Sequence, residues 1–372
     1  MAETSTALIH CIAGARPNFV KIGPIMRALS AREGLAARLI NTGQHYDAQM
    51  SRAFFEDLAL PEPDRHLEVG SGSHGAQTAR VLERYEQVLA EERPALTLVV
   101  GDVNSTLACA LAAAKAGVAV AHVEAGLRSF DRGMPEEINR LLTDQLADYL
   151  FITCRDAGDN LLREGIAAEK IHFVGNVMID ALVESLPLAA RRAAPARFGL
   201  TGRAYAVATI HRPSNVDTAE GFTRVLEILA GTGARLPVVF PLHPRTEKRA
   251  AELGLEARLR GLPGVILTPP LRYLEFLDLL RQARLVLTDS GGLQEETSVL
   301  GIPCLTLRAN TERPVTISQG TNRLAGTDPA VVLQAAGEVL DAPPPASPPV
   351  IELWDGRAAP RIAEALALAL ID

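Results

Sequence analysis

The sequence predicts an α/β protein with two parallel β-sheets, one in each of two domains. Short apolar runs alternate with longer amphipathic stretches over nearly the whole chain. The apolar runs are almost continuous in Val, Ile, Leu and Ala, which is typical of parallel strands covered on both faces. A length of 372 residues, 48% of them hydrophobic, supplies enough apolar side chains for two buried cores.

The strands and helices follow each other in the order expected of βαβ units. The expected strands are residues 7–13, 96–101, 118–123, 149–153, 171–174, 205–210, 237–242, 265–267, 285–288 and 303–307. The main expected helices are residues 74–91, 105–116, 135–148, 219–231, 273–283 and 291–300. This repeated order predicts a doubly wound sheet in each half of the chain.

A domain boundary is expected at residues 175/176, after the strand at 171–174 and before a fresh run of strands. The first domain would then be residues 1–175 and the second residues 176–355. Residues 342–349 are rich in proline, which lacks the N–H that a helix or central strand needs. We expect this segment to be a surface crossing that leads to a last helix at 361–370.

Composition excludes several classes of function. A formal net charge of −7 without basic runs argues against nucleic acid or an anionic membrane as partner. No apolar run approaches the roughly 18 residues of a membrane span, and the first residues lack a basic targeting region. Four scattered cysteines and the absence of H-E-x-x-H predict no disulfide framework and no metal site. We expect a soluble, cytoplasmic protein.

Polar side chains follow the ends of the expected strands. In parallel α/β sheets, ligands bind outside the carboxyl ends of the strands. Residues at such positions are Arg16, Asp102 and Glu124 in the first half and His211, His243, Ser290 and Arg313 in the second. Two such rows facing each other predict a ligand cleft.

The clearest anion site is Ser290-Gly-Gly292, which lies between a strand and a helix start. Free N–H groups and the helix dipole attract phosphate there, and glycines permit close approach of the backbone. Glu296, within the first turns, is suited to ribose hydroxyls. The alternative is that Asp289 or Ser290 is only a helix N-cap. Lys21, in the turn after Arg16, is either a second phosphate contact or an exposed helix charge.

Three carboxylates in the first half, Asp102, Glu124 and Glu136, are enough to act as acid and base on opposite faces of a substrate. For Glu136 the alternative is a surface ion pair with Arg140, four residues along the helix. His211 ends a strand in the other half, and both a structural and a catalytic role stay open.

The segment at residues 70–75 matches G-x-G-x-x-G but does not indicate a nicotinamide site. Residues 65–69 before it are too polar and too few for the first strand of a dinucleotide fold. The chain also lacks a Tyr-x-x-x-Lys pair. We therefore expect a loop at 70–75 and no cofactor.

Taken together, the motifs resemble the non-hydrolysing UDP-N-acetylglucosamine 2-epimerase family. The motifs are Gly14-Ala-Arg-Pro-Asn-Phe-Val-Lys21, Thr42-Gly-Gln-His45, Gly101-Asp102, His122-Val-Glu-Ala-Gly-Leu-Arg128, Pro135-Glu-Glu137, Gly175-Asn176, His211-Arg212, Asp289-Ser-Gly-Gly-Leu-Gln-Glu-Glu296 and Thr311-Glu-Arg-Pro314. The resemblance implies two Rossmann-like domains of glycosyltransferase-B type with a UDP-sugar cleft between them. It also implies that the last helix, at 356–372, packs back on the first domain, and that the protein is a homodimer.

The resemblance assigns site residues as well. The implied catalytic residues are Asp102, Glu124, Glu136 and His211. The implied substrate-binding residues are Arg16, Lys21, His211, Phe276, Ser290, Gly291, Gly292, Glu296 and Arg313. Whether a second UDP-GlcNAc binds at an activating site, to which Gln44 and His243 could belong, stays open.

The implied reaction is reversible epimerisation of UDP-GlcNAc to UDP-ManNAc for cell-surface polysaccharide precursors. Anti elimination of UDP gives 2-acetamidoglucal, and re-addition of UDP gives the C2 epimer. Four alternatives stay open: a UDP-diacetamido-uronic acid 2-epimerase, a hydrolysing 2-epimerase, a glycosyltransferase of the same fold and a non-catalytic UDP-sugar sensor.

Overall fold

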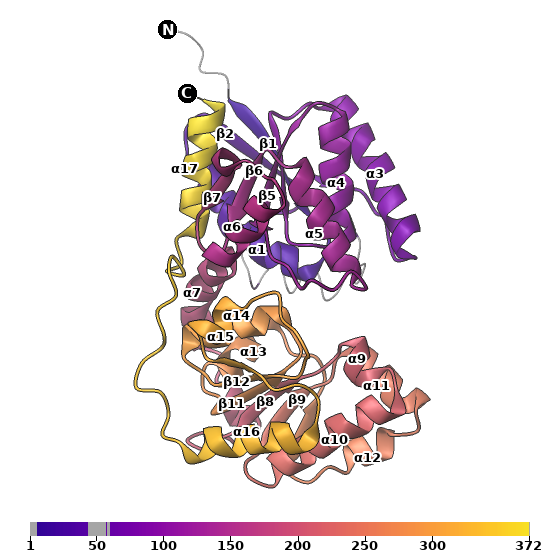
Figure 1. The fold of residues 1–372 in the computed structure, drawn as a ribbon, viewed down its shortest axis with the longest axis vertical. Coiled ribbons are helices and arrows are strands. Elements are labelled where there is room, and N and C mark those ends of the chain that lie inside the picture. Colours follow the sequence, from indigo (N-terminus) through magenta and orange to yellow (C-terminus); the bar gives the residue numbers. More distant parts are fainter. Residues whose placement is uncertain (1–5, 44–56, 58–59, 372) are drawn as a thin grey trace. The chain divides into compact units, whose positions relative to one another are not determined.

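The computed structural model describes residues 6–43, 57 and 60–371 and contains two parallel β-sheets flanked by helices (Figure 1). The chain divides into two compact units, one of Met1–Glu184 with Glu352–Asp372 and one of Ser185–Ile351. The division lies beyond the expected 175/176, because helix α7 (Val177–Ala189) starts in the first unit and continues past Glu184.

The first unit contains a seven-stranded sheet in the order β3-β2-β1-β4-β5-β6-β7, with every pair parallel. Its strands are β1 (Ala7–Ala13), β2 (Leu35–Asn41), β3 (Arg65–His66), β4 (Leu96–Val100), β5 (Ala119–Ala125), β6 (Tyr149–Ile152) and β7 (Ile171–Phe173). Its helices, with α7, are α1 (Arg16–Ser30), α3 (His74–Glu91), α4 (Asn104–Lys115), α5 (Pro135–Leu146), α6 (Arg155–Arg163), η1 (Ala168–Lys170) and α17 (Ala358–Leu370). This strand order is that of a dinucleotide-binding fold.

The second unit repeats the same order with six strands, β10-β9-β8-β11-β12-β13, again all parallel. Its strands are β8 (Ala206–Thr209), β9 (Val238–Pro241), β10 (Val265–Thr268), β11 (Leu285–Thr288), β12 (Cys304–Thr306) and β13 (Asn322–Leu324). Its helices are α8 (Ala194–Arg197), α9 (Pro213–Val216), α10 (Ala219–Gly233), α11 (Pro244–Glu252), α12 (Glu256–Arg260), α13 (Tyr273–Leu280), α14 (Gly291–Leu300), α15 (Val315–Ser318) and α16 (Pro329–Asp341).

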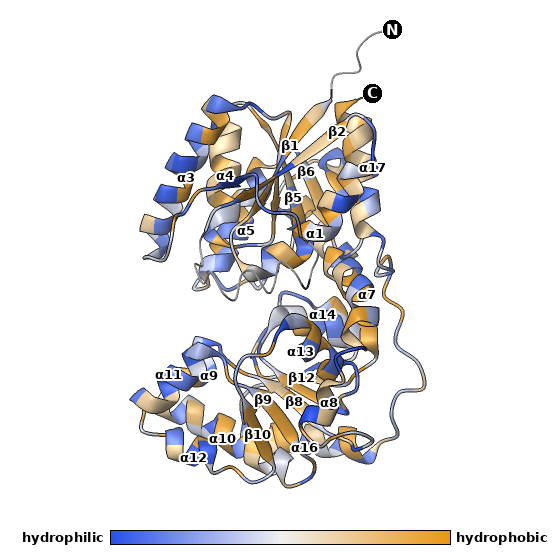
Figure 2. Cartoon of the chain, turned by 180° about the vertical axis from the view of Figure 1, so that it is seen from behind, coloured by the Kyte–Doolittle hydropathy of each residue, from blue (hydrophilic) through white to orange (hydrophobic). Residues whose placement is uncertain are grey.

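Each unit has its own hydrophobic core around its sheet. In the first, side chains of β1, β4 and β5 pack against α1 and α17, with Phe19, Ile22 and Ile362 buried. In the second, Phe222 and Phe240 are fully buried between α10 and the sheet. The strands of both sheets are predominantly apolar, as Figure 2 shows. Within the described residues, no helix has both the length and the hydropathy to cross a bilayer.

The α/β fold class and its two parallel sheets are confirmed, and each of the ten expected strands has a counterpart. Three strands, β2, β3 and β13, were not predicted from the sequence. The residues of β2 are Leu-Ala-Ala-Arg-Leu-Ile-Asn, with an arginine and partly exposed positions near the sheet edge. β3 and β13 have two and three residues, which is too short for a periodic signal. Residues 70–73 form a loop before α3, but the expected loop at 70–75 is wrong at its end, because Ser73 caps α3 and residues 74 and 75 belong to its first turn.

The proline-rich segment at 342–349 contains no regular structure and is almost entirely exposed, as expected. The chain after it is fixed to the first unit by several contacts. The Trp354 indole N–H donates to the Thr153 carbonyl at 2.9 Å, and the Asp180 carboxylate accepts the Ala359 N–H at 2.7 Å at the start of α17. Gly175, at φ +89°, lies so close to Leu353 that a Cβ would be 2.0 Å from its carbonyl oxygen.

We expect Gly175→Ala to lower the free energy of unfolding by more than the cost of placing alanine at a positive φ. Gly165→Ala is the matched control, because Gly165 also has a positive φ (+83°) but has open space where the added methyl group would stand. The control should lose about 1 kcal/mol of unfolding free energy. Gly175→Ala should lose about 2 kcal/mol more, because a backbone carbonyl must move. Denaturant unfolding of both variants measures this, and equal losses would contradict the close contact.

Candidate active site

Asp102 lies just after the carboxyl end of β4 and is held by residues of α5. The Arg140 guanidinium donates to the Asp102 carboxylate, whose side chain is 31% exposed. Asn139 donates from its side-chain amide to the Asp102 backbone carbonyl at 2.9 Å. The carboxylate is therefore oriented by a buried cation and still reachable from outside the protein.

Glu124 occupies an irregular position within β5. Its φ is +74°, a left-handed conformation that is rare for a residue with a Cβ, and the register with β6 shifts between Val123 and Ala125. Such a bulge redirects a side chain, and the conformation costs of order 1–3 kcal/mol. Here it brings the Glu124 carboxylate into an ion pair with Lys21 of α1.

Lys21 is buried rather than an exposed helix charge, with 7% of the residue accessible. Gly101, in the turn after β4, lies directly beside the ion pair. A Cβ on Gly101 would make ordinary contacts with the Lys21 ammonium at 3.4 Å and with a Glu124 carboxylate oxygen at 3.5 Å. Glycine is favoured at this position by its φ of +67° and not by lack of space.

Glu136 is half-buried in the first turn of α5 and has no hydrogen-bond or ion-pair partner among the described residues. The alternative of a pair with Arg140 is wrong, because Arg140 donates to Asp102 and to Glu137. Glu137 in turn accepts the backbone N–H groups of Ser129 and Phe130 at 2.9 Å. Burial opposes its ionisation, but these donors and Arg140 together lower the pKa of Glu137.

A fully buried network below these carboxylates was not predicted. His122 contacts Asp144 at 2.6 Å through Nδ1 and the Gly101 carbonyl at 2.8 Å through Nε2. Arg128 pairs with the same aspartate at 2.7 Å. Although burial opposes ionisation, His122 and Arg128 lower the pKa of Asp144. The network joins β5, α5 and the turn that carries Asp102.

In the second unit, Asp289 organises the loop that carries His211. Asp289 is fully buried after β11 and accepts the backbone N–H of His211 at 3.0 Å and of Arg212 at 2.8 Å. The His211 ring, 35% exposed, stacks on His243 with ring centroids 4.9 Å apart. His243 also accepts the Arg245 N–H at 3.1 Å and so caps α11.

Ser290 stands at the N-cap position of α14, but its side chain makes no capping hydrogen bond. The carboxylate of Asp289 is engaged with the His211 loop instead. Neither Asp289 nor Ser290 therefore caps α14 with its side chain, so the N-cap alternative is wrong. The positive end of the helix dipole at Ser290-Gly-Gly292 is left available to an anion. A Cβ on Gly291 would be 2.5 Å from the Arg313 guanidinium, so glycine allows that cation to lie beside the helix start.

Arg313 belongs to a buried group of arginines and glutamates that the sequence alone did not indicate. It lies 2.8 Å from Glu295 and pairs with Glu312, and Arg308 donates to Glu312 at 2.8 Å. Arg308, 4% exposed, follows the carboxyl end of β12, the same signal that indicated other site residues. Burial opposes ionisation, but Arg313 and Arg308 hold the pKa of Glu312 far below its ordinary value.

Glu296 differs from these paired carboxylates. Burial raises its pKa from 4.5 to about 7, and the hydroxyl of Tyr273 lies 3.3 Å from its carboxylate.

The remaining expected site residues are placed as follows. Phe276 is half-buried on α13, one turn after Tyr273. Arg16 is the first residue of α1, and nothing is described of its side chain. Gln44 lies outside the described residues.

Comparison with known proteins decides the family. The profile of UDP-N-acetylglucosamine 2-epimerases matches residues 27–367. The chain belongs to the UDP-N-acetylglucosamine 2-epimerase family. It is 44% identical over 337 residues to the UDP-N-acetylglucosamine 2-epimerase of Methanococcus maripaludis, covering 89% of this chain and 91% of that protein. The resemblance drawn from the motifs is thereby confirmed.

Two further members of this family are informative. The UDP-2,3-diacetamido-2,3-dideoxy-D-glucuronate 2-epimerase of Pseudomonas aeruginosa is 43% identical over 332 residues, covering 88% of this chain and 91% of that protein. The crystal structure of Methanocaldococcus jannaschii UDP-GlcNAc 2-epimerase in complex with UDP-GlcNAc and UDP is similar with a TM-score of 0.90 at 42% identity, covering 97% of this chain and 99% of that one. The two Rossmann-like units are accordingly of the glycosyltransferase-B type.

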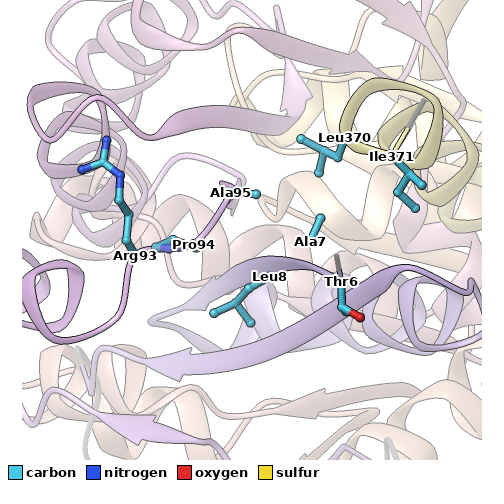
Figure 3. Close-up of a pocket in the computed structure, with 8 residues that line it drawn as sticks. All are labelled: Thr6, Ala7, Leu8, Arg93, Pro94, Ala95, Leu370 and Ile371. Carbon is cyan, nitrogen blue, oxygen red and sulfur yellow. The ribbon is translucent and has the colours of Figure 1, made fainter. Parts of the chain in front are cut away.

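A cavity of about 500 Å³ lies in the first unit, where β1 and β4 begin (Figure 3). Thr6, Leu8, Arg93 and Leu370 are among its lining residues. The amino ends of the strands are the opposite edge of the sheet from Asp102 and Glu124, so this cavity is separate from the candidate active site.

We expect Glu296 to make the stability of the protein depend on pH. Because its folded-state pKa is raised from 4.5 to about 7, its contribution is fully present below pH 4.5 and is lost as the pH rises through about 7. Glu296→Gln has no charge to bury and should be more stable than the wild type at pH 8 by roughly 1–3 kcal/mol.

Denaturant unfolding at pH 5 and pH 8 measures this difference. The control is Glu220→Gln, which changes a carboxylate on an exposed side chain of α10. The control should keep the wild-type pH dependence. If Glu296→Gln keeps it as well, the raised pKa of Glu296 is refuted.

Proposed function

We propose that this chain is a non-hydrolysing UDP-N-acetylglucosamine 2-epimerase that interconverts UDP-GlcNAc and UDP-ManNAc as precursors of cell-surface polysaccharide. The observation that carries the proposal is the set of three carboxylates, Asp102, Glu124 and Glu136, at the carboxyl edge of the first sheet. Acid–base chemistry on both faces of a sugar needs such a set. The uncapped helix start at Ser290 in the second unit supplies the complementary anion site.

The second unit supplies most of the proposed nucleotide contacts. The N–H groups of Ser290, Gly291 and Gly292 and the side chain of Arg313 would bind the diphosphate. Glu296, which is largely protonated below pH 7, is suited to donate to or accept from the ribose hydroxyls. Phe276 would pack against uracil, because its half-buried ring offers an apolar face. From the first unit, Arg16 and Lys21 would add cations for the phosphates.

The reaction explains why carboxylates and a phosphate site are needed together. The C2 proton of an N-acetyl sugar has no neighbouring carbonyl carbon to make it acidic. Breaking the bond between C1 and the phosphate oxygen in the same step builds positive charge at C1 and makes removal of the proton feasible. The electron pair of the C2–H bond forms the double bond of 2-acetamidoglucal, and the pair of the C1–O bond leaves with UDP.

His211 is proposed as the fourth essential group, and its placement explains how. Asp289 fixes the backbone of His211 and lies 3.4 Å from its ring Nδ1. The Asp289 carboxylate thereby holds the ring in one orientation and leaves the other ring nitrogen, Nε2, for the substrate. The proton leaves and returns at C2 without any hydride transfer, so the proposed reaction needs no nicotinamide.

A second candidate substrate is a UDP-diacetamido-uronic acid, because the Pseudomonas aeruginosa relative with that name is 43% identical to this chain. Incubation with each UDP-sugar separates the two. A hydrolysing epimerase would release free ManNAc, and a glycosyltransferase would move no C2 proton.

We also propose that the protein is located in the cytoplasm. All four cysteines are free and buried, which fits that reducing compartment.

We expect purified protein with UDP-GlcNAc in deuterated water to incorporate deuterium at C2 and to form UDP-ManNAc, observed by NMR. Asp102→Asn, Glu124→Gln and Glu136→Gln should each lower the exchange rate by at least about 100-fold, because each removes a group that takes up or delivers a proton. UDP binding, measured by calorimetry, should survive in all three. Three variants with near wild-type exchange would contradict the assigned roles.

We also propose a homodimer, with part of the interface on α5. Ile138 and Leu142 are one turn apart on this helix and are 45% and 48% exposed. Leu142→Glu should shift the protein towards the monomer in sedimentation equilibrium, because it would bury a charge. Leu162→Glu is the control, since Leu162 is equally exposed (51%) on α6. A monomeric wild type, or a Leu142→Glu variant that dimerises as the wild type does, would contradict this interface.

A further inference from the structure

The ion pair of Lys21 with Glu124 has two properties that a purely structural salt bridge does not need. Both side chains are almost inaccessible, with 9% exposed for Lys21 and 6% for Glu124. A buried pair gives little net stability, because each ion loses its hydration. The pair also requires the left-handed backbone at Glu124 (φ +74°), which itself costs free energy. The fold therefore bears two costs for a contact that stabilises it little.

The position of Lys21 on α1 gives this cation access to a second anion. α1 follows directly on β1, and its N-cap residue Ala15 offers no side-chain oxygen to the helix start. No acidic residue lies in its first turn. Asn18 folds back instead, and its side-chain oxygen accepts the Ala15 N–H at 3.0 Å. This end of α1 is electropositive, which suits a diphosphate, and Lys21 follows the first helical residue by about one and a half turns.

We propose that Lys21 serves two anions in turn: it neutralises Glu124 in the free enzyme and moves to the diphosphate when a UDP-sugar binds, so that substrate binding releases Glu124 to act as the base. This inference rests on the proposed function. A diphosphate ester carries two negative charges against one on Glu124, so it attracts the ammonium more strongly. Glu124, relieved of its counterion in a buried place, then attracts a proton more strongly.

The elimination step transfers negative charge between the two anions that Lys21 serves. The Glu124 carboxylate takes the C2 proton and becomes neutral, while the electrons of the C2–H bond form the C1=C2 bond. The C1–O bond breaks, and its electron pair gives UDP one further negative charge. One unit of negative charge has thus passed from Glu124 to the leaving diphosphate. Lys21, within reach of Glu124 and directed to the phosphate, stabilises the charge at its destination.

The test measures UDP affinity rather than turnover. If Glu124 competes with UDP for Lys21, then Glu124→Gln removes the competitor and should bind UDP more tightly, by about fivefold or more. Lys21→Met should bind UDP more weakly than the wild type. Adding Glu124→Gln to Lys21→Met should change nothing further, because the cation for which the two anions compete is gone. Isothermal calorimetry on all four proteins completes the cycle.

Glu184→Gln is the matched control, because Glu184 pairs with Arg27, another cation of α1, on an exposed surface. Its UDP affinity should stay within twofold of the wild type. If Glu124→Gln does not fold, Glu124→Ala removes the same charge and carries the same expectation. Unchanged or weaker UDP binding by the Glu124 variant, or equal tightening in the Lys21→Met background, overturns the inference while leaving the epimerase proposal standing. A wild type that binds no UDP overturns both.

Discussion

Compensation of buried charge is the constraint on which both candidate halves of the site depend. A carboxylate removed from water stays ionised only beside cations or hydrogen-bond donors. Glu124 has Lys21, Asp102 has Arg140, and Asp144 lies between His122 and Arg128. Each of these three carboxylates of the first unit thus has a cation beside it that offsets the cost of removing a negative charge from water.

The second unit applies the same constraint with one exception. Its arginines and glutamates pair beside the start of α14, where Arg308 and Arg313 keep Glu312 ionised. Glu296 has Tyr273 as its hydrogen-bond partner, and burial raises its pKa to about 7. The protonated form of this carboxyl, which the raised pKa favours, does not repel phosphate. The unit therefore combines a cationic helix start with a group suited to hydroxyls.

Much of this arrangement could be predicted from the sequence, because the carboxyl ends of parallel strands are recognisable as polar residues after apolar runs. Asp102, Glu124 and Ser290 were found in this way. Their partners could not be predicted, since the pairs of Lys21 with Glu124 and of Arg140 with Asp102 join residues distant in sequence. The bulge at Glu124 was also missed, because a left-handed glutamate has no local signature. β2 was missed for a different reason: its arginine and alanines dilute the apolar run.

In the proposed reaction, loss of the C2 proton to a carboxylate and departure of UDP are one event. UDP-GlcNAc labelled with deuterium at C2 and with ¹⁸O in the bridge between C1 and phosphate tests this directly. Mass spectrometry and NMR of recovered substrate should show deuterium loss accompanied by movement of ¹⁸O into the non-bridging phosphate positions. Deuterium loss with all ¹⁸O still in the bridge would contradict the account, because proton removal would then proceed without cleavage of the C1–O bond.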